Sequence, residues 1–111
     1  MISLQMIFME EGVLDRVREI DLLNSRIISV PRLLILASLE QLGLDGATYR
    51  ELKAGLEMED GILYSNLKAL EEMGYLKEKD VRLEKKELAS YHMTDEGKNA
   101  LRAVRIWLRK I

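Results

Sequence analysis

Four residues near the middle of the chain combine useful chemistry with helical spacing. Gly61, Tyr64, Ser65 and Lys68 share one side of a predicted helix at residues 59–73 if each residue turns by about 100°. The hydroxyl groups of Tyr64 and Ser65 can bond phosphate oxygens or base edges, and the Lys68 ammonium can reach a phosphate or a guanine. Gly61 would let a backbone approach closely. The other side of this helix is apolar, so plain core packing also explains the pattern.

Five cations form a second group farther along the chain. Acidic residues are interspersed among these cations, which are Lys77, Lys79, Arg82, Lys85 and Lys86. Cations on a projecting hairpin would neutralise phosphates and position a domain without carrying sequence information. A solvated charged loop is the alternative interpretation.

The residue types do not favour catalysis or metal binding. The chain has no cysteine and a single histidine, His92. It shows no nucleophile–base pair, no glycine-rich phosphate loop and no carboxylate cluster on a rigid face. We therefore predict no enzyme activity, no cofactor and no metal site, and we interpret His92 as a half-buried strand residue.

Composition indicates one small domain. The chain has 111 residues, of which 48% are hydrophobic, and its net charge is −2. Because the chain is not basic overall, nucleic-acid binding would require a local cluster of positive charges. The longest apolar stretch, residues 33–37, is far shorter than the roughly 20 residues of a membrane helix. No signal peptide is recognised, so we expect a cytoplasmic protein without a membrane partner.

Helix signals divide the first two thirds of the chain. Pro31 suits the first turn of a helix that ends at Gly43. Thr48 and Glu51 have the spacing of a capping box, which opens a short helix that we expect to end at Gly55.

The remaining elements follow the predicted helix at 59–73. Leucines 63, 67 and 70 give that helix an apolar face, and Gly74 suits its C-terminal end. Residues 75–93 are predicted to form a β-hairpin with the charged run 80–87 at its tip. Thr94 suits the N-cap of a last helix that reaches the C-terminus.

This order of elements is that of a winged helix-turn-helix, and two stretches resemble a known group. TYRELKAGLEMEDGILYSNLKALEEMGYLKEK, followed by YHMTDEGKNAL, resembles the winged-helix core of MarR-, ArsR- and PadR-type transcriptional regulators over residues 31–100. The GILY start is most similar to PadR-type proteins. The resemblance rests on Gly61, Leu63, Tyr64, Leu67, Leu70, Glu71, Gly74, Tyr75, Met93, Thr94 and Gly97.

The resemblance implies a mainly α (α+β) fold, with a two-stranded wing and flanking N- and C-terminal dimerisation helices. It also implies a sequence-specific DNA-binding transcriptional regulator, acting as a homodimeric repressor on double-stranded DNA. Helix 59–73 would enter the major groove, and the wing at 77–88 would lie on the backbone or the minor groove.

Three acidic residues favour a different function. Glu57, Glu59 and Asp60 stand at the start of the predicted recognition helix, where phosphates would lie. They can interact with the helix dipole or accept from cytosine N4, but they also repel phosphates. The alternative is therefore a winged helix that binds other proteins, with little or no DNA binding.

We expect three parts: an N-terminal helical extension (1–30), the winged helix (31–93) and a C-terminal helix (94–111). Dimerisation is expected through apolar seams on both terminal helices, although each helix could instead fold back on its own core. The seam residues are Val13, Val17 and Ile20, then Leu101, Val104 and Leu108.

The last helix also carries a basic stripe. The stripe fits a solvent face, and contact with DNA flanks or an acidic partner is the alternative; its members are Lys98, Arg102, Arg105 and Arg109. The sequence gives no signature of a small-molecule effector, so the existence of one stays open.

Overall fold

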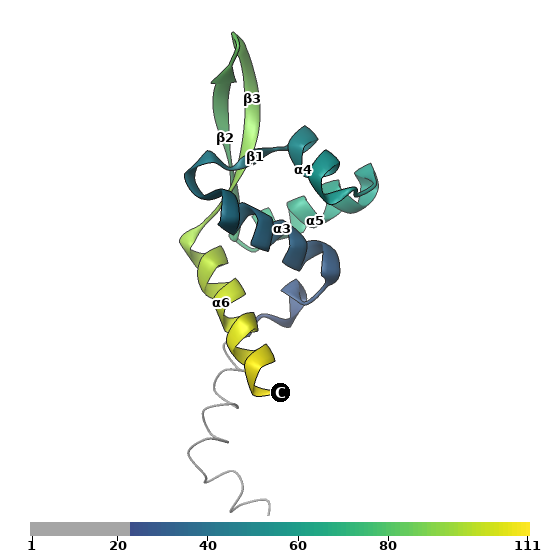
Figure 1. Ribbon diagram of the computed structural model, residues 1–111, viewed down its shortest axis with the longest axis vertical. Helices are drawn as coiled ribbons and strands as arrows, with labels where there is room; N and C mark the ends of the chain where they lie inside the picture. Colours follow the sequence, from purple (N-terminus) through teal and green to yellow (C-terminus); the bar gives the residue numbers. More distant parts are fainter. Residues whose placement is uncertain (1–22) are drawn as a thin grey trace, which may run out of the picture.

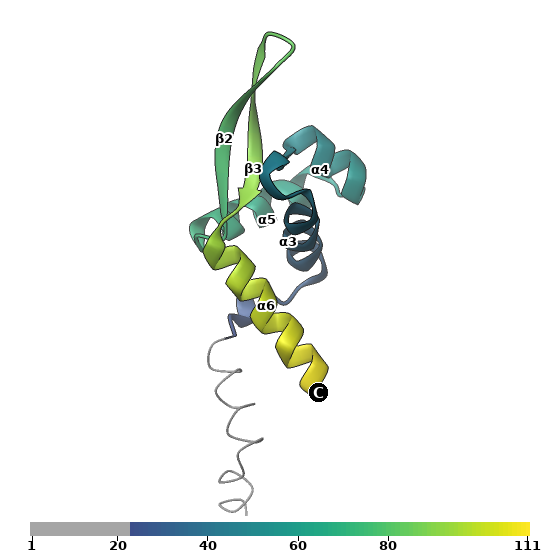
Figure 2. The ribbon, with the colours of Figure 1, turned by 60° about the vertical axis from the view of Figure 1, so that its left-hand side comes forward.

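The computed structural model describes residues 23–111. Over this range the fold is mainly helical with a small sheet, which confirms the predicted class. The helices are α3 (Val30–Leu42), α4 (Tyr49–Leu56), α5 (Asp60–Glu72) and α6 (Asp95–Lys110). The strands are β1 (Ala47–Thr48), β2 (Leu76–Leu83) and β3 (Lys86–Met93), and two 3-10 turns flank α3, η1 (Ser25–Ile27) and η2 (Gly43–Asp45). The β2–β3 hairpin projects from one end of the helical body, and α6 runs to the other end (Figure 1, Figure 2).

Side chains that cap the backbone set the helix starts, and Pro31 and Thr48 act at the positions predicted for them. Ser29 Oγ accepts from the backbone N–H of Arg32 at 3.3 Å, and Pro31 occupies the first turn of α3. At α4, Thr48 Oγ1 accepts from Glu51 N at 3.2 Å while Glu51 Oε1 accepts from Thr48 N at 3.1 Å. The capping box is therefore present, as the spacing predicts.

The predicted end of α4 at Gly55 is wrong. The helix continues to Leu56, and Glu57 forms its C-terminal cap in the left-handed region with φ 53°. The left-handed cap that glycine usually supplies is here supplied by a glutamate. Gly55 therefore lies inside the helix.

Gly74 ends α5 as predicted. It has φ 80°, and its N–H donates to Glu71 O at 2.9 Å. Tyr75 N donates to Leu70 O at 2.9 Å. These two bonds form a Schellman motif, which turns the chain from α5 into β2.

The charged run lies mostly in the strands and not in a loop. Leu83 pairs with Lys86, so only Glu84 and Lys85 form the turn. Both have positive φ, 50° and 69°, as a tight two-residue hairpin turn requires. The predicted eight-residue tip is therefore wrong, because cross-strand pairing continues to the end of the hairpin.

The antiparallel sheet has the order β1-β3-β2. One core fills the space between the sheet and the helices. Its fully buried side chains come from η1, α3, α5 and α6, and they are Ile27, Ile35, Leu36, Leu39, Leu63, Leu67, Leu70 and Val104.

Two predicted dimerisation residues belong to this core. Leu101 is 3% exposed and Val104 is 1% exposed, so both pack within their own chain. Their assignment to a dimer seam is wrong, and α6 folds back on its own core over that stretch. Leu108, which is 51% exposed, stays on the surface. Val13, Val17 and Ile20, and most of the expected extension at 1–30, lie outside the described residues.

Candidate nucleic-acid interface

Helix α5 separates a buried apolar face from an exposed polar face. Leu63, Leu67 and Leu70 are fully buried, whereas Tyr64 is 55% exposed and Lys68 lies on the surface. The Lys68 ammonium lies 5.6 Å from the centre of the Tyr64 ring, within cation–π range. The helix therefore presents a hydroxyl group and a cation at one place.

Ser65 and Gly61 lie on the same exposed face. Ser65 Oγ donates to the Ile62 carbonyl at 3.3 Å, which leaves its lone pairs able to accept. Within the described part of the chain, a Cβ added at Gly61 would meet nothing within 4 Å. The four residues predicted to contact DNA from this helix are therefore all exposed on one face; they are Gly61, Tyr64, Ser65 and Lys68.

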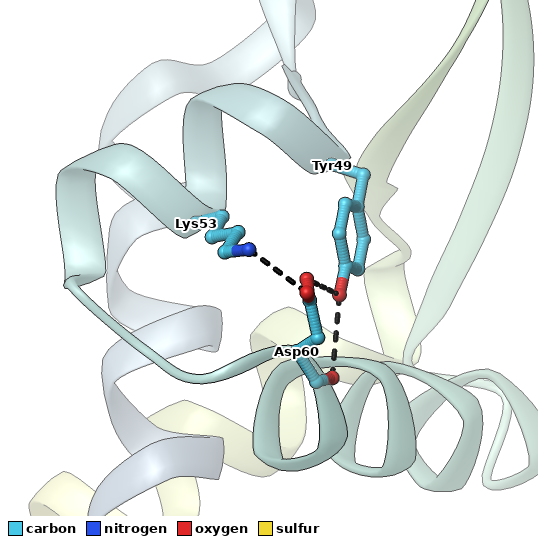
Figure 3. A network of polar contacts seen from close by, with 3 residues as sticks. All are labelled: Tyr49, Lys53 and Asp60. Carbon is cyan, nitrogen blue, oxygen red and sulfur yellow. Dashed lines mark hydrogen bonds and ion pairs between the residues drawn. The ribbon is translucent and has the colours of Figure 1, made fainter.

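The first residue of α5 is tied to α4 by a polar network (Figure 3). Lys53 Nζ lies 2.9 Å from Asp60 Oδ2, and the Tyr49 hydroxyl donates to Asp60 Oδ1 at 2.9 Å. The hydrogen bonds from Lys53 and then Tyr49 hold the pKa of Asp60 below its usual value. One of the three acids expected to oppose phosphates is therefore engaged in fixing the angle between α4 and α5.

A second link fixes α5 to α3. Arg32 Nε donates to Asn66 Oδ1 at 2.9 Å, and Asn66 Nδ2 donates to the Ile62 carbonyl at 2.8 Å. Glu57 and Glu59, by contrast, are exposed at the α4–α5 turn. The turn therefore still presents negative charge to solvent.

The two faces of the hairpin carry different charges. The register pairs Lys77 with His92 and Lys79 with Ser90, and side chains alternate between faces along a strand. Within the two strands, the face with His92 carries cations and no acid; its cations are Lys77, Lys79 and Lys86. The other face carries Arg82 together with Glu78, Asp80 and Glu87.

The acidic face is the one that turns toward α5. Burial, and then the nearby negative charge of Glu78, raise the pKa of Glu71 on α5. Burial and Glu78 also raise the pKa of the Tyr91 hydroxyl on the same face. Of the predicted wing cations, Arg82, Lys85 and Lys86 lie near the tip, while Lys77 and Lys79 lie at the base of the hairpin.

His92 is more buried than predicted, with 6% exposure. Its Nε2 lies 2.6 Å from Ser90 Oγ, which is also buried. Burial, and then the charges of Lys79 and Lys77, lower the pKa of its imidazole.

The basic stripe of α6 is partly engaged within the chain. Arg105 makes an ion pair with Glu40 of α3, with Nη1 2.6 Å from Oε1. Lys98, Arg102 and Arg109 are exposed. The pair joins α6 to α3, and the exposed members fit the expected solvent face.

Sequence reasoning missed the positioning residues of this interface. Tyr49 and Lys53 are four residues apart on one helix, a spacing that places them on one face. Their shared partner Asp60 follows a turn, so the contact depends on the angle between two helices. Arg32 and Asn66 are 34 positions apart, and the sequence holds no signal that joins them.

The three helices α3, α4 and α5, followed by a β-hairpin, define a winged helix. The chain belongs to the winged helix DNA-binding domain family, whose model matches residues 31–111. A family of DNA-binding domains agrees with the prediction that the protein is no enzyme. No helix within residues 23–111 is long and apolar enough to cross a membrane.

Solved structures of three bacterial proteins are similar to this chain. One is smu.1704 from Streptococcus mutans UA159, with 23% identity and a TM-score of 0.61, over 74% of this chain and 80% of that one. The second is a PadR family transcriptional regulator from Eggerthella lenta DSM 2243, with 26% identity and a TM-score of 0.57, over 84% and 88%. The third is a PadR-like transcription factor from Bacteroides fragilis, with 16% identity and a TM-score of 0.56, over 90% and 91%. A comparison with curated proteins found no match.

Proposed function

We propose that the protein is a cytoplasmic transcriptional regulator that binds double-stranded DNA as a homodimer and represses by blocking a promoter. The observation that carries this proposal is the exposed polar face of α5 in a chain of the winged helix DNA-binding domain family. The similarity to a PadR family transcriptional regulator supports the regulatory role.

In this proposal α5 enters the major groove. Tyr64, Ser65 and Lys68 read base edges, and Gly61 permits close approach of the helix. The cation–π contact holds Lys68 beside Tyr64, which reduces the side-chain freedom that is lost on binding. The network at Asp60 fixes the helix that presents these groups.

The wing then contacts the backbone or the minor groove through its outer cations. Arg82, Lys85 and Lys86 lie near the tip, away from the helical body, where they can reach phosphates. We do not assign Lys77 and Lys79 to DNA, because they lie at the base of the hairpin beside α6.

A salt titration tests the proposal. The protein is titrated with the DNA upstream of its own gene and with a scrambled duplex of equal length, while its mass in solution is recorded. We expect a dimer that prefers its own upstream DNA by about a thousandfold, with affinity falling steeply as salt rises.

Two substitutions distinguish residues that recognise bases from residues that contact phosphates. Lys68→Gln is expected to reduce the preference between the two duplexes. Lys85→Gln is expected to weaken binding to both duplexes equally and to reduce the salt slope by about one. Arg102→Gln on α6 removes the same charge away from the wing and serves as the control.

Exposed acids favour the alternative of a protein-binding module. Glu57 and Glu59 at the α4–α5 turn, and the acidic face of the wing, would both repel phosphates. Absence of binding to either duplex at low salt would overturn the regulator proposal in favour of this module.

A further inference from the structure

A pocket of about 390 Å³ lies behind the base of the wing, where β2, β3, η2 and the start of α6 meet. Cations from two elements line it: Lys77 and Lys79 from β2, and Lys98 from α6. The sequence pattern predicts DNA contacts for Lys77 and Lys79 and a solvent face for Lys98. The structure instead places all three lysines in the lining of one pocket.

The pocket also has an apolar wall. Leu39 and Met93 come from the core side, and Leu44 stands at the rim with 95% of its surface exposed. A ligand with a short hydrocarbon group would cover part of Leu44, which gains free energy by removing apolar surface from water.

One lining residue of the pocket, His92, is held in place by its neighbours. His92 lines the pocket beside Lys77, its cross-strand partner, and its imidazole is fixed by Ser90 Oγ at 2.6 Å. Gly46 packs against the imidazole so closely that a Cβ there would lie 2.5 Å from His92 Cε1. A preformed site of this kind loses little ordering entropy when it binds a ligand.

The charges of the lining select the ligand class. Asp95 and Glu96 at the start of α6 also line the pocket, so three cations face two carboxylates. The balance of one positive charge suits a monoanion better than a dianion. We infer that this pocket binds a small organic monoanion, a carboxylate with a short apolar group, whose charge lies between Lys77 and Lys79.

The single histidine of the chain makes a direct test possible. Hexanoate is titrated into the full-length protein while the imidazole resonances of His92 are followed by NMR. Acetate supplies the charge without the chain, and hexan-1-ol supplies the chain without the charge. We expect saturable shifts with hexanoate, much weaker binding of acetate and no saturation with hexan-1-ol.

Bound hexanoate should also raise the pKa of His92, since its carboxylate would offset the charges of Lys79 and Lys77. Lys77→Gln combined with Lys79→Gln should weaken hexanoate binding by about tenfold, as expected for two exposed ion pairs. Lys98→Gln should weaken it less. Arg102→Gln, four residues along α6 and outside the pocket, should leave it unchanged.

Three results would overturn the inference: equal shifts with hexanoate and hexan-1-ol, shifts that never saturate, or a double variant that binds like the unaltered protein. The amide spectrum of each variant reports whether it is folded. No DNA is present in this test, so its result is independent of the proposed regulatory function.

Discussion

At the scale of single residues, Gly97 has the least room for a side chain among the glycines of residues 23–111. A Cβ built there would lie 2.3 Å from the Tyr75 carbonyl oxygen and 2.8 Å from Met93 Cγ. That carbonyl also accepts from Thr94 N at 3.0 Å, so it cannot move without weakening the start of α6. The glycine is required because the backbone of the α5–β2 turn passes directly over the helix.

Gly97→Ala should therefore lower the free energy of unfolding by about 3 kcal/mol, the cost of forcing a methyl group into a filled space. Urea denaturation measures this loss. Gly55→Ala is the matched control, because within the described residues its Cβ would meet nothing within 4 Å. The control should gain up to about 1 kcal/mol from helix propensity. Similar losses in both variants would contradict the packing argument.

The exposed residues of α5 could be predicted because they depend on one helix alone. The spacing of Leu63, Leu67 and Leu70 fixes the buried side, and the polar side follows from it. The contacts of Asp60 could not be predicted in the same way. They depend on how α4 and α5 cross, which helical periodicity does not determine.

At the scale of elements, the junction between α5 and the wing contains two acids. Glu71 of α5 faces Glu78 of β2 and Tyr91 of β3, with Lys68 one turn back on its own helix. Among the described residues, Glu71 Oε1 is buried without a hydrogen-bond partner. Burial first, and then the charge of Glu78, raise the pKa of Glu71 above its ordinary value of 4.5.

This raised pKa gives the junction a defined pH dependence. The folded state holds the Glu71 proton more tightly than the unfolded state, so stability falls as pH rises from 4.5 through the folded pKa. Glu71→Gln should remove this fall, with a gain over the unaltered protein of about 1 kcal/mol near neutral pH and almost none at low pH. Urea denaturation across pH measures it.

The exposed neighbour Glu72 supplies the control for this experiment. Glu72→Gln removes the same charge from the same helix without a buried carboxylate. Its stability should follow the unaltered protein across pH. If the stability of Glu71→Gln varied with pH in the same way as that of Glu72→Gln and of the unaltered protein, the folded state would not bind the Glu71 proton more tightly than the unfolded state.

Element boundaries were predictable where a side chain bonds the backbone locally. Thr48, Gly74 and Thr94 mark their helix ends because each acts within a few residues of itself. The charged run at 80–87 was misread because strand pairing, which is not local, extends the hairpin through it. The number of charges in this run also does not show that successive side chains point to opposite faces of the hairpin, with cations on one face and most of the acids on the other.

At the scale of the whole molecule, α6 has one end in the core and one end outside it. Leu101 and Val104 are buried, whereas Leu108 is 51% exposed and Ile111 is 81% exposed. We propose that this outer end contributes to the homodimer contact, because exposed apolar residues at a helix end gain by packing against another helix. The sequence alone does not separate the buried end of this helix from the exposed end, since the apolar residues keep helical spacing from Leu101 to Ile111.

Leu108→Asp should therefore raise the dissociation constant of the dimer by at least about tenfold, because it places a charge in an apolar contact. Analytical ultracentrifugation over a concentration series measures this change. Leu34→Asp on α3 makes the same substitution at a leucine that is 45% exposed, and it should leave the dimer intact. Unchanged association of Leu108→Asp would rule out the outer end of α6 as a contact.

The sheet order also bears on whether the protein stays dispersed. Within residues 23–111, strand β2 is at the edge of the sheet and β1 covers β3 only at Ser90 and Tyr91, so the outer hairpin has two open edges there. Open edges can pair with strands of other molecules, and closely spaced charges prevent that pairing. The charged side chains of the wing thus protect against aggregation whatever they bind. Neutralising most of the charges in the outer hairpin, residues 80–87, together would be expected to make the protein precipitate.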